Sequence, residues 1–371
     1  MDPKNRLNVD ESQVNQRIGQ VRARRPRLTE DHVTLAHGAG GKASAALLDA
    51  VFLEGYGNAV LSEQEDAGVA PLSALLPAGR PGTRLAFSTD SYVVNPIEFP
   101  GGSIGELAVN GTVNDLAVSG AEPTLISAAF ILEEGLPVDT LRRVVADMRA
   151  AADAAGVTII TGDTKVVPRG AADQLYITTA GVGLIPDDRV LGTREVRAGD
   201  KLILSGPIAD HGMAVMLARG ELAIDAPISS DTRAINHLTS ALLDAAPHTR
   251  WLRDATRGGL GTVLNELAAA SGCGVAIEEA AIPLRETTRA ACDLLGIDPL
   301  YVANEGTFVA VAAPEEAESA LAALRSMPGG AEAAIIGRIV TEPAQAVVMI
   351  TSFGGTRMVD MLVGDPLPRI C

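Results

Sequence analysis

Short apolar runs alternate with amphipathic stretches along almost the whole chain, and this alternation restricts the fold more than any other feature. Apolar runs at 125–132, 175–185 and 308–312 are short enough for strands, whereas 138–155 and 259–271 have the length and apolar spacing of helices. Strands that alternate with helices in this way are typical of α/β proteins. The pattern predicts a mixed α/β (α+β) fold.

The length and composition set further bounds. The chain has 371 residues, of which 47% are hydrophobic and 20% charged, and this suits two globular domains with sizeable cores. Aromatic residues make up only 3%, so the cores are expected to consist of Ala, Val, Leu and Ile. The net charge of −16 repels nucleic acid and anionic membranes, and we expect neither as a partner.

The chain divides into four predicted segments. Residues 1–27 are polar and are predicted to form a disordered extension, followed by α/β domains at 28–192 and 193–345. Residues 346–371 are predicted to form a last strand and a mobile tail. The tail ends in Gly364-Asp-Pro-Leu-Pro-Arg-Ile-Cys371, where two prolines exclude a helix or a central strand.

Cysteine usage indicates a cytoplasmic protein. The three cysteines, Cys273, Cys292 and Cys371, are an odd number without the spacing of a disulfide framework or a zinc site. No segment reaches the roughly 18 consecutive apolar residues of a membrane span. Cys371 differs from the other two, because a thiol at the tip of a Pro-rich arm can enter a site and leave it again.

Three acidic residues lie within or directly after apolar segments. Asp90 and Asp163 are predicted at strand ends and Asp115 within a helix, beside Asn114. Strand ends are where α/β proteins gather ligands, and hard oxygen donors suit Mg²⁺. The sequence therefore predicts Asp90, Asp115 and Asp163 as metal ligands. The alternative is that each acts only as a cap or turn residue.

A glycine loop and three charged residues complete the candidate chemistry. The loop His37-Gly-Ala-Gly-Gly-Lys42 can wrap phosphate with its backbone N–H groups, although a structural turn would look the same. Lys165 can neutralise a departing phosphate or move a proton. Glu305 lies between apolar runs and is the best general-base candidate, with an ion pair to an arginine such as Arg257 as the alternative.

The ordered set of motifs resembles the HypE family of hydrogenase maturation factors, within the superfamily of aminoimidazole ribonucleotide synthetase and selenophosphate synthetase. The resemblance runs from about residue 37 to the C-terminus and rests on the motifs HGAGGK, FSTDSYVVNPIEFPGG, GELAVNGTVNDLAVSGA, GDTKVV, GDKLILSGPIADHG, LRDATRGGLGTVLNELA, ANEG and the terminal PRIC. Selenophosphate synthetases usually carry cysteine or selenocysteine in the N-terminal glycine loop, and this loop has none.

The resemblance implies a two-domain synthetase-type fold in which the N-terminal domains of two subunits pair into a β-barrel. ATP and Mg²⁺ would lie between the domains and near the subunit contact. The resemblance implies that ATP is bound by residues from both the glycine loop and the later motifs: His37, Gly38, Gly40, Gly41, Lys42, Asn114, Asp163, Thr164 and Arg257. It implies Cys371, Lys165 and Glu305 as the catalytic residues.

The resemblance also implies the reaction and its partners. The carbamoyltransferase HypF would load Cys371 as a thiocarbamate, ATP would activate the amide oxygen, and loss of water would leave a thiocyanate. The cyanide would pass to iron on a HypC–HypD scaffold, for a [NiFe]-hydrogenase. Two alternatives stay open: a non-catalytic carrier of a group on Cys371, and a synthetase or kinase like selenophosphate synthetase.

Overall fold

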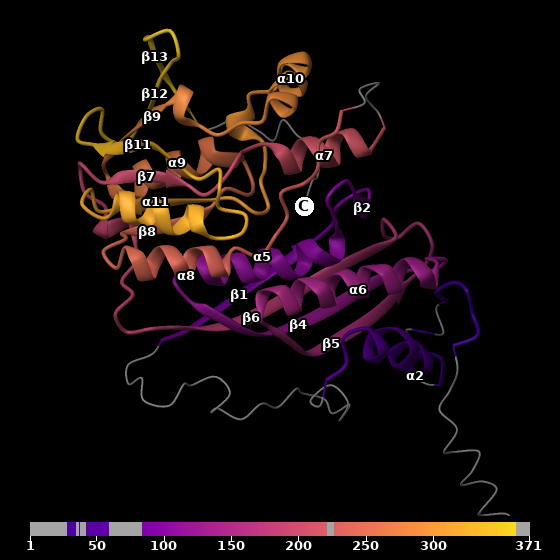
Figure 1. The fold of residues 1–371 in the computed structure, drawn as a ribbon. Helices are drawn as coiled ribbons and strands as arrows, with labels where there is room; N and C mark the ends of the chain where they lie inside the picture. The colour runs from indigo at the N-terminus through magenta and orange to yellow at the C-terminus, as the bar shows by residue number, and fades with distance from the viewer. Residues whose placement is uncertain (1–27, 35–36, 38–41, 59–83, 221–225, 361–371) are drawn as a thin grey trace, which may run out of the picture.

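A computed structural model describes residues 28–34, 37, 42–58, 84–220 and 226–360 of the chain. Two large β-sheets, a short two-stranded sheet and the helices packed around them make up this part of the molecule (Figure 1). The mixed α/β fold predicted from the apolar pattern is confirmed. No helix in these ranges is both long enough and apolar enough to cross a membrane.

The N-terminal half forms a four-stranded sheet in the order β1-β6-β4-β5. The β1–β6 and β6–β4 pairs are antiparallel, whereas β4 and β5 are parallel and are joined through α6. A parallel pair needs such a crossover. The elements of this half are α2 (Lys42–Leu47), η3 (Leu48–Leu53), α3 (Glu54–Tyr56), β1 (Arg84–Tyr92), β2 (Glu98–Phe99), β3 (Gly102–Ser103), α5 (Ile104–Val118), β4 (Glu122–Glu133), α6 (Val138–Ala155), β5 (Thr158–Val167) and β6 (Leu175–Ile185).

The C-terminal half forms a seven-stranded sheet in the order β13-β12-β9-β11-β7-β10-β8. β12 and β9 pair in parallel, and the other neighbouring strands are antiparallel. The elements are η5 (Thr193–Glu195), β7 (Lys201–Leu204), α7 (Asp210–Ala218), α8 (Asn236–Ala245), β8 (Trp251–Asp254), α9 (Gly259–Ser271), β9 (Gly274–Glu278), η6 (Glu279–Ala281), α10 (Glu286–Leu295), η7 (Pro299–Tyr301), β10 (Phe308–Ala312), α11 (Ala317–Ser326), β11 (Ala334–Val340), β12 (Val347–Ile350) and β13 (Thr356–Met358).

Helix α5 is the layer between the two halves. Ser103 caps its N-terminus, where the hydroxyl accepts the Gly105 N–H at 3.2 Å. Because 12 of its 15 residues are buried, it has the character of an internal helix rather than a surface one. It packs on β1 and β6 of the first sheet and on α8 and β8 of the second half (Figure 1).

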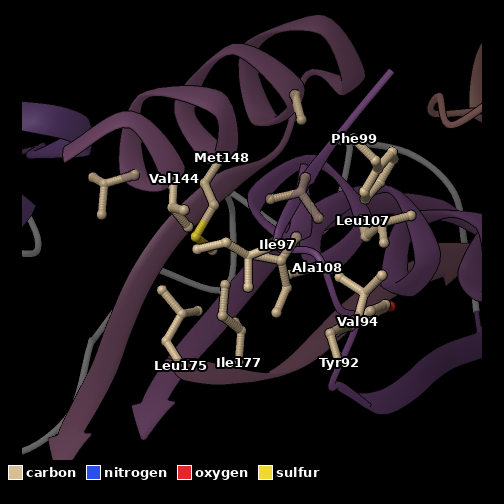
Figure 2. Packing of buried hydrophobic residues seen from close by; sticks show 14 of the residues in the cluster. Tyr92, Val94, Ile97, Phe99, Leu107, Ala108, Val144, Met148, Leu175 and Ile177 are labelled. Atoms are coloured by element: carbon tan, nitrogen blue, oxygen red, sulfur yellow. The ribbon is translucent and has the colours of Figure 1, made fainter. Parts of the chain in front are cut away.

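The hydrophobic core crosses from one half to the other. Figure 2 shows Tyr92, Leu107, Met148 and Ile177 converging in the N-terminal half. The same cluster continues into the C-terminal half, where it includes Met213, Val302 and Cys292. The two halves are therefore held together by apolar contact, and α5 keeps a fixed place against both.

Several local expectations were wrong. β1 and β5 run past Asp90 and Asp163, so these residues lie inside strands and not at strand ends, because β6 and β4 continue to pair with them. Helix α10 and strand β8 were not expected, since each is short and weakly marked in the sequence.

The four-stranded sheet has two unlike faces. On β1, Ser88, Asp90 and Tyr92 point toward α5, in the same direction as the buried core. The opposite face is open and carries large apolar side chains: Leu85 is 64% exposed, Phe87 68% and Ile131 41%. Exposed apolar side chains in this number usually mark a contact surface.

Candidate active site

A cleft of about 950 Å³ separates the two halves beside α5. This volume is in the range of pockets that hold a nucleotide-sized ligand. Its walls come from β1, the exposed end of α5, β8 and the turn into α9. The polar, charged and aromatic residues that line it include Ser88, Asp90, Asp115, Trp251, Arg253, Asp254, Arg257 and Glu266.

One wall of the cleft is acidic. Ser88 Oγ donates to Asp115 Oδ2 at 2.7 Å, and the Asp90 carboxylate accepts the Ser91 N–H at 2.8 Å. Burial, together with the charges of Asp254 and Asp90, raises the pKa of Asp115 to about 6. This wall gathers more negative charge than its own hydrogen bonds can neutralise, so it favours a bound cation or a proton.

The opposite wall can hold an anion. The chain turns from β8 into α9 through Gly258 and Gly259, whose φ angles are 72° and 61°. A Cβ on Gly259 would lie 2.6 Å from the Leu300 carbonyl oxygen, so only glycine fits this turn. The N-terminus of the 13-residue helix α9 and the exposed Arg257 side chain meet at this wall. Helix N-termini and arginine both favour phosphate groups.

Glu305 lies behind the acidic wall. Its side chain is 3% exposed, and its Oε1 accepts no hydrogen bond from any residue that the structure describes. Burial raises the pKa of Glu305 well above its ordinary value, and the charges of Asp231, Asp254, Asp90 and Asp115 add to the effect. The nearest ion-pair partner in the described ranges is His211, whose Nε2 lies 4.0 Å from Oε1. The alternative of an ion pair with Arg257 is therefore not what the structure contains.

The backbone around Glu305 is fixed from two sides. The N–H groups of Glu305 and Gly306 donate to the two oxygens of Asp231, at 2.9 and 3.0 Å. A Cβ on Gly306 would lie 1.9 Å from the Asp231 carbonyl oxygen, so the close approach of this second segment depends on glycine. Asn114 Nδ2 donates to the Glu305 carbonyl oxygen at 3.0 Å, and its Oδ1 accepts the Ile235 N–H at 2.9 Å. Asn114 thus ties α5 to the Glu305 segment.

Asp163 and Lys165 lie elsewhere. They stand on β5, on the open face of the sheet, in register with Ala129 and Ile131 of β4. Lys165 Nζ donates to Asp163 Oδ1 at 2.7 Å, and this contact lowers the pKa of Asp163. β1 and β5 are three strand spacings apart, roughly 14 Å, so Asp163 does not join Asp90 within one chain.

The structure describes only some of the other predicted ATP-binding residues. His37 is buried, and its Nδ1 accepts the Thr34 N–H at 2.9 Å. Thr164 stands on β5, where its N–H donates to Asp163 Oδ1 at 2.8 Å. Lys42 begins α2, but its side chain lies outside the described part, as do Gly38, Gly40, Gly41, Cys371 and the extension 1–27. The roles predicted for these residues stay predictions.

The donor set of the cleft fits Mg²⁺ with phosphate rather than a metal held by protein alone. Within the described ranges, no three His, Cys, Asp or Glu side chains gather closely enough to bind a metal. Mg²⁺ commonly takes only one or two carboxylates and completes its shell with water and phosphate oxygens. Asp90 and Asp115 supply such carboxylates on one face, and burial, with the nearby charges of Asp254 and Asp90, raises the pKa of Asp115.

Sequence reasoning overlooked two residues beside Glu305. His211 belongs to a quoted motif, GPIADHG, but a single histidine in an apolar stretch gives no sign of its partner. Asp231 precedes α8, and nothing in the sequence around it points to the Glu305 backbone. Both contacts join segments more than seventy residues apart.

Known proteins resemble this chain closely. Residues 64–185 match the AIR synthase related protein family, N-terminal domain, and residues 197–350 match the C-terminal domain of the same family. The carbamoyl dehydratase HypE of Rhodobacter capsulatus is 53% identical over 344 residues, which covers 93% of this chain and 99% of the relative. A crystal structure of a HypE in complex with ATP superposes with a TM-score of 0.85 at 45% identity, covering 91% of this chain and 99% of that one. A HypE–HypF complex contains a chain with a TM-score of 0.73 at 41% identity, covering 85% of this chain and 100% of that one.

Proposed function

The chain belongs to the HypE family of carbamoyl dehydratases, and from this premise we propose that it converts a carbamoyl group on its own Cys371 into a thiocyanate, at the expense of ATP. The product would supply cyanide to the iron centre of a [NiFe]-hydrogenase. The observation that carries the proposal is the buried carboxyl of Glu305, which lies behind a cleft with one acidic and one anion-binding wall. Among the described residues, no donor forms a hydrogen bond with its Oε1.

The reaction has two bond-making stages. In the first, the carbamoyl oxygen of S–C(=O)NH₂ attacks the γ-phosphate of ATP and the nitrogen loses one proton, giving ADP and the phosphorylated imidate S–C(OPO₃²⁻)=NH. In the second, the remaining N–H breaks as the C–O bond to phosphate breaks, giving S–C≡N and phosphate that takes up a proton. Two protons leave the same nitrogen, and a buried base with a raised pKa is suited to receive them near neutral pH.

The residues of the cleft have separate tasks in this proposal. Asp90 and Asp115 would hold Mg²⁺, which supplies charge neutralisation for the phosphates when bound. Arg257 and the N-terminus of α9 would orient phosphate oxygens, as would the glycine loop at 37–42. Glu305 would take protons from the carbamoyl nitrogen. The depth of Glu305 behind the cleft would keep water from the reacting carbon.

Asp163 and Lys165 require a second subunit in this proposal. They share the open face of the sheet with Leu85, Phe87 and Ile131, which are the exposed apolar side chains of that face. We place the predicted dimer contact there, with the two sheets closing into a β-barrel. Lys165 of one subunit would then act in the cleft of the other, beside the partner's phosphates. This arrangement reconciles the family pattern with the distance between β5 and β1 in one chain.

The tail would connect the site to other proteins. An arm of the eleven residues after Asp360 can reach at most about 36–40 Å when extended, so one cysteine can visit the cleft and also a partner. HypF is the proposed donor of the carbamoyl group and a HypC–HypD scaffold the proposed acceptor of cyanide, in the cytoplasm. Tethering keeps the reacting group at a high effective concentration during the dehydration.

The deciding experiment is an intact-mass measurement on carbamoylated protein, before and after addition of Mg-ATP. We expect a single turnover to remove the mass of one water and to form one ADP per chain. Cys371→Ala should accept no carbamoyl group, whereas Cys273→Ala and Cys292→Ala should behave as the parent protein. ATP binding without loss of water would favour the carrier alternative, and carbamoylation of the Cys371→Ala variant would overturn the assignment of the carrier cysteine.

A further inference from the structure

Tyr92 carries a buried hydroxyl at the inner end of the acidic wall. It is the last residue of β1, and its ring packs in the core that Figure 2 shows. Only 2% of the residue is exposed, yet its Oη forms no hydrogen bond with any residue that the structure describes. Most buried hydroxyls have a partner within the protein, so an unpaired one beside a site points to a ligand.

A glycine in helix α5 makes room for this hydroxyl. A Cβ on Gly111 would lie 2.1 Å from Tyr92 Oη, which is closer than two such atoms can approach. Glycine inside a helix is less favourable than alanine. The hydroxyl therefore occupies a place that α5 leaves open at a cost to its own stability, and the position of Oη against the helix is fixed.

The contact with Gly111 continues the polar face of β1 inward. At the outer end, Ser88 Oγ donates to Asp115 Oδ2 at 2.7 Å, and both residues line the cleft. Tyr92 is four residues further along β1, and Gly111 is about one turn back along α5. Asp90 lies between Ser88 and Tyr92 on the same face of the strand. Tyr92 is thus the buried end of the line of polar groups that faces α5.

Glu305 approaches the same end from the other half of the molecule. Asn114, three residues after Gly111 on α5, donates to the Glu305 carbonyl oxygen at 3.0 Å. Burial raises the pKa of Tyr92 well above its ordinary value, and the charges of Asp90 and Glu305 add to the effect, as expected for neighbouring groups. Tyr92 Oη and Glu305 Oε1 are therefore two buried oxygens that lie near each other, and neither has a donor among the described residues.

Thr112 carries a neighbouring hydroxyl, but its proton is engaged elsewhere. Thr179 Oγ1 donates to the Ala108 carbonyl oxygen at 2.8 Å and lies 2.7 Å from Thr112 Oγ1, so Thr112 is the donor between the two threonines. Thr112 can therefore offer Tyr92 only a lone pair. Even if Tyr92 turned its O–H toward Thr112, Oη would keep a lone pair with which to accept a hydrogen bond.

A carbamoyl group matches two buried acceptors. Its planar NH₂ offers two N–H donors in fixed directions, and on the proposed function its oxygen has to face the γ-phosphate in the cleft. We propose that Tyr92 Oη accepts one of these N–H groups while Glu305 Oε1 accepts the other. Two such contacts fix the plane of the group and turn its oxygen outward to the phosphates. Tyr92 is then the residue that orients the substrate and selects an unsubstituted amide nitrogen.

The test is a single turnover of carbamoylated Tyr92→Phe with Mg-ATP, since this substitution removes only the oxygen. The melting temperature should equal that of the parent protein or exceed it, because the lost hydroxyl is unpaired. ADP formation and water loss should both slow by roughly twofold to tenfold, as for one neutral hydrogen bond. Mg-ATP affinity should stay unchanged. Tyr56→Phe is the matched control, because Tyr56 is a buried tyrosine at the end of α3 that packs on Phe52.

An NMR measurement separates orientation of the substrate from packing. With ¹⁵N in the carbamoyl group and a non-hydrolysable ATP analogue bound, the parent protein should show two N–H signals, both displaced from those of a free thiocarbamate. Tyr92→Phe should return one of them toward the free position, and Tyr56→Phe should move neither. Slower turnover of Tyr92→Phe without this change, or a melting temperature well below that of the parent, would assign the hydroxyl to packing and overturn the inference.

These measurements keep the inference distinct from the proposed function on which it rests. If the carbamoylated parent protein loses water and Tyr92→Phe matches it in rate and in both N–H signals, the inference is overturned and the proposed function stands. If the parent protein loses no water with Mg-ATP, both are overturned.

Discussion

The two acidic groupings of the N-terminal half differ in almost every physical respect, although both were selected by the same sequence reasoning. Asp90 and Asp115 face the cleft between the halves, where burial and neighbouring carboxylates raise the pKa of Asp115 to about 6. Asp163 lies on the open face of the sheet, where Lys165 lowers its pKa. Among the described residues, no basic side chain forms an ion pair with Asp90 or Asp115, whereas Asp163 is paired with Lys165.

This difference indicates that the two acidic groupings have separate roles. An uncompensated acidic wall is costly in the free protein and becomes favourable when a cation or proton arrives, which is the behaviour of a binding site. An exposed, compensated ion pair contributes little to stability, so its presence among apolar side chains needs another reason. The proposed contact with a second subunit would supply that reason.

The largest effect is expected for Glu305, which lies behind Asp90 and Asp115. Glu305→Gln keeps the size of the side chain and removes its basicity, so thiocyanate formation should slow by about a hundredfold or more. Carbamoylation and Mg-ATP affinity should stay as they are. A single-turnover mass measurement gives the rate, and Glu266→Gln is the matched control, because Glu266 lines the same cleft but pairs with Arg253 at 3.4 Å. A near-normal rate in Glu305→Gln would move the base role to another group.

Mixing two inactive variants sharpens the comparison between the groupings. Glu305→Gln and Lys165→Met should each be slow alone. If Lys165 acts across the subunit contact, random exchange of subunits in a C₂ dimer should restore about a quarter of the sites, since half of the dimers are mixed and each has one intact site. Water loss by the mixture, followed by mass, is the measurement. No recovery after demonstrated exchange would place both residues in the same chain's site.

The open face itself can be tested with two exposed apolar residues. Leu85→Asp introduces a charge where we propose subunit contact, and the dimer should dissociate at concentrations where the parent protein stays paired. Phe353→Asp is the control, because Phe353 is 99% exposed in the turn between β12 and β13, away from that face. Sedimentation velocity distinguishes the masses. Equal behaviour of the two variants would contradict the assignment of the contact.

The smallest effect concerns the pH dependence of thermal stability at Asp115. The folded pKa of Asp115, about 6, is above the ordinary value of 3.8, so the folded state binds a proton more tightly than the unfolded state in this window. The contribution of Asp115 to the stability of the parent protein should therefore fall as the pH rises from about 4 to about 7. Asp115→Asn should melt a few degrees higher than the parent at neutral pH, with the difference vanishing in acid.

Calorimetric melting curves at both pH values measure this effect. Mg-ATP should then stabilise the parent protein more than Asp115→Asn, because the variant lacks one carboxylate for the cation. A variant that melts below the parent at neutral pH would mean that the Asp115 carboxylate is stabilising, and that the hydrogen bond from Ser88 outweighs the burial.

The sequence by itself determined the α/β class and most helices and strands, and it selected Glu305 as a candidate base. These follow from local apolar spacing and from a charged residue within apolar runs, which are properties of neighbouring residues. The residues also pointed to Lys165 and the terminal cysteine, and the family resemblance gave roles to these and to Arg257. The expectation that Asp90 and Asp163 end their strands was wrong, because the length of a strand depends on its partner strands.

Only the tertiary structure decided which of these residues meet. Burial of Glu305, its four acidic neighbours and the facing His211 all arise from segments that are far apart in sequence, and no local pattern encodes their distances. The face of a strand is likewise fixed by register: Asp90 points to α5 and Asp163 to the open side because of where β6 and β4 pair. Sequence therefore supplied the chemical groups, and long-range packing decided their surroundings, since pKa and contact depend on three-dimensional neighbours.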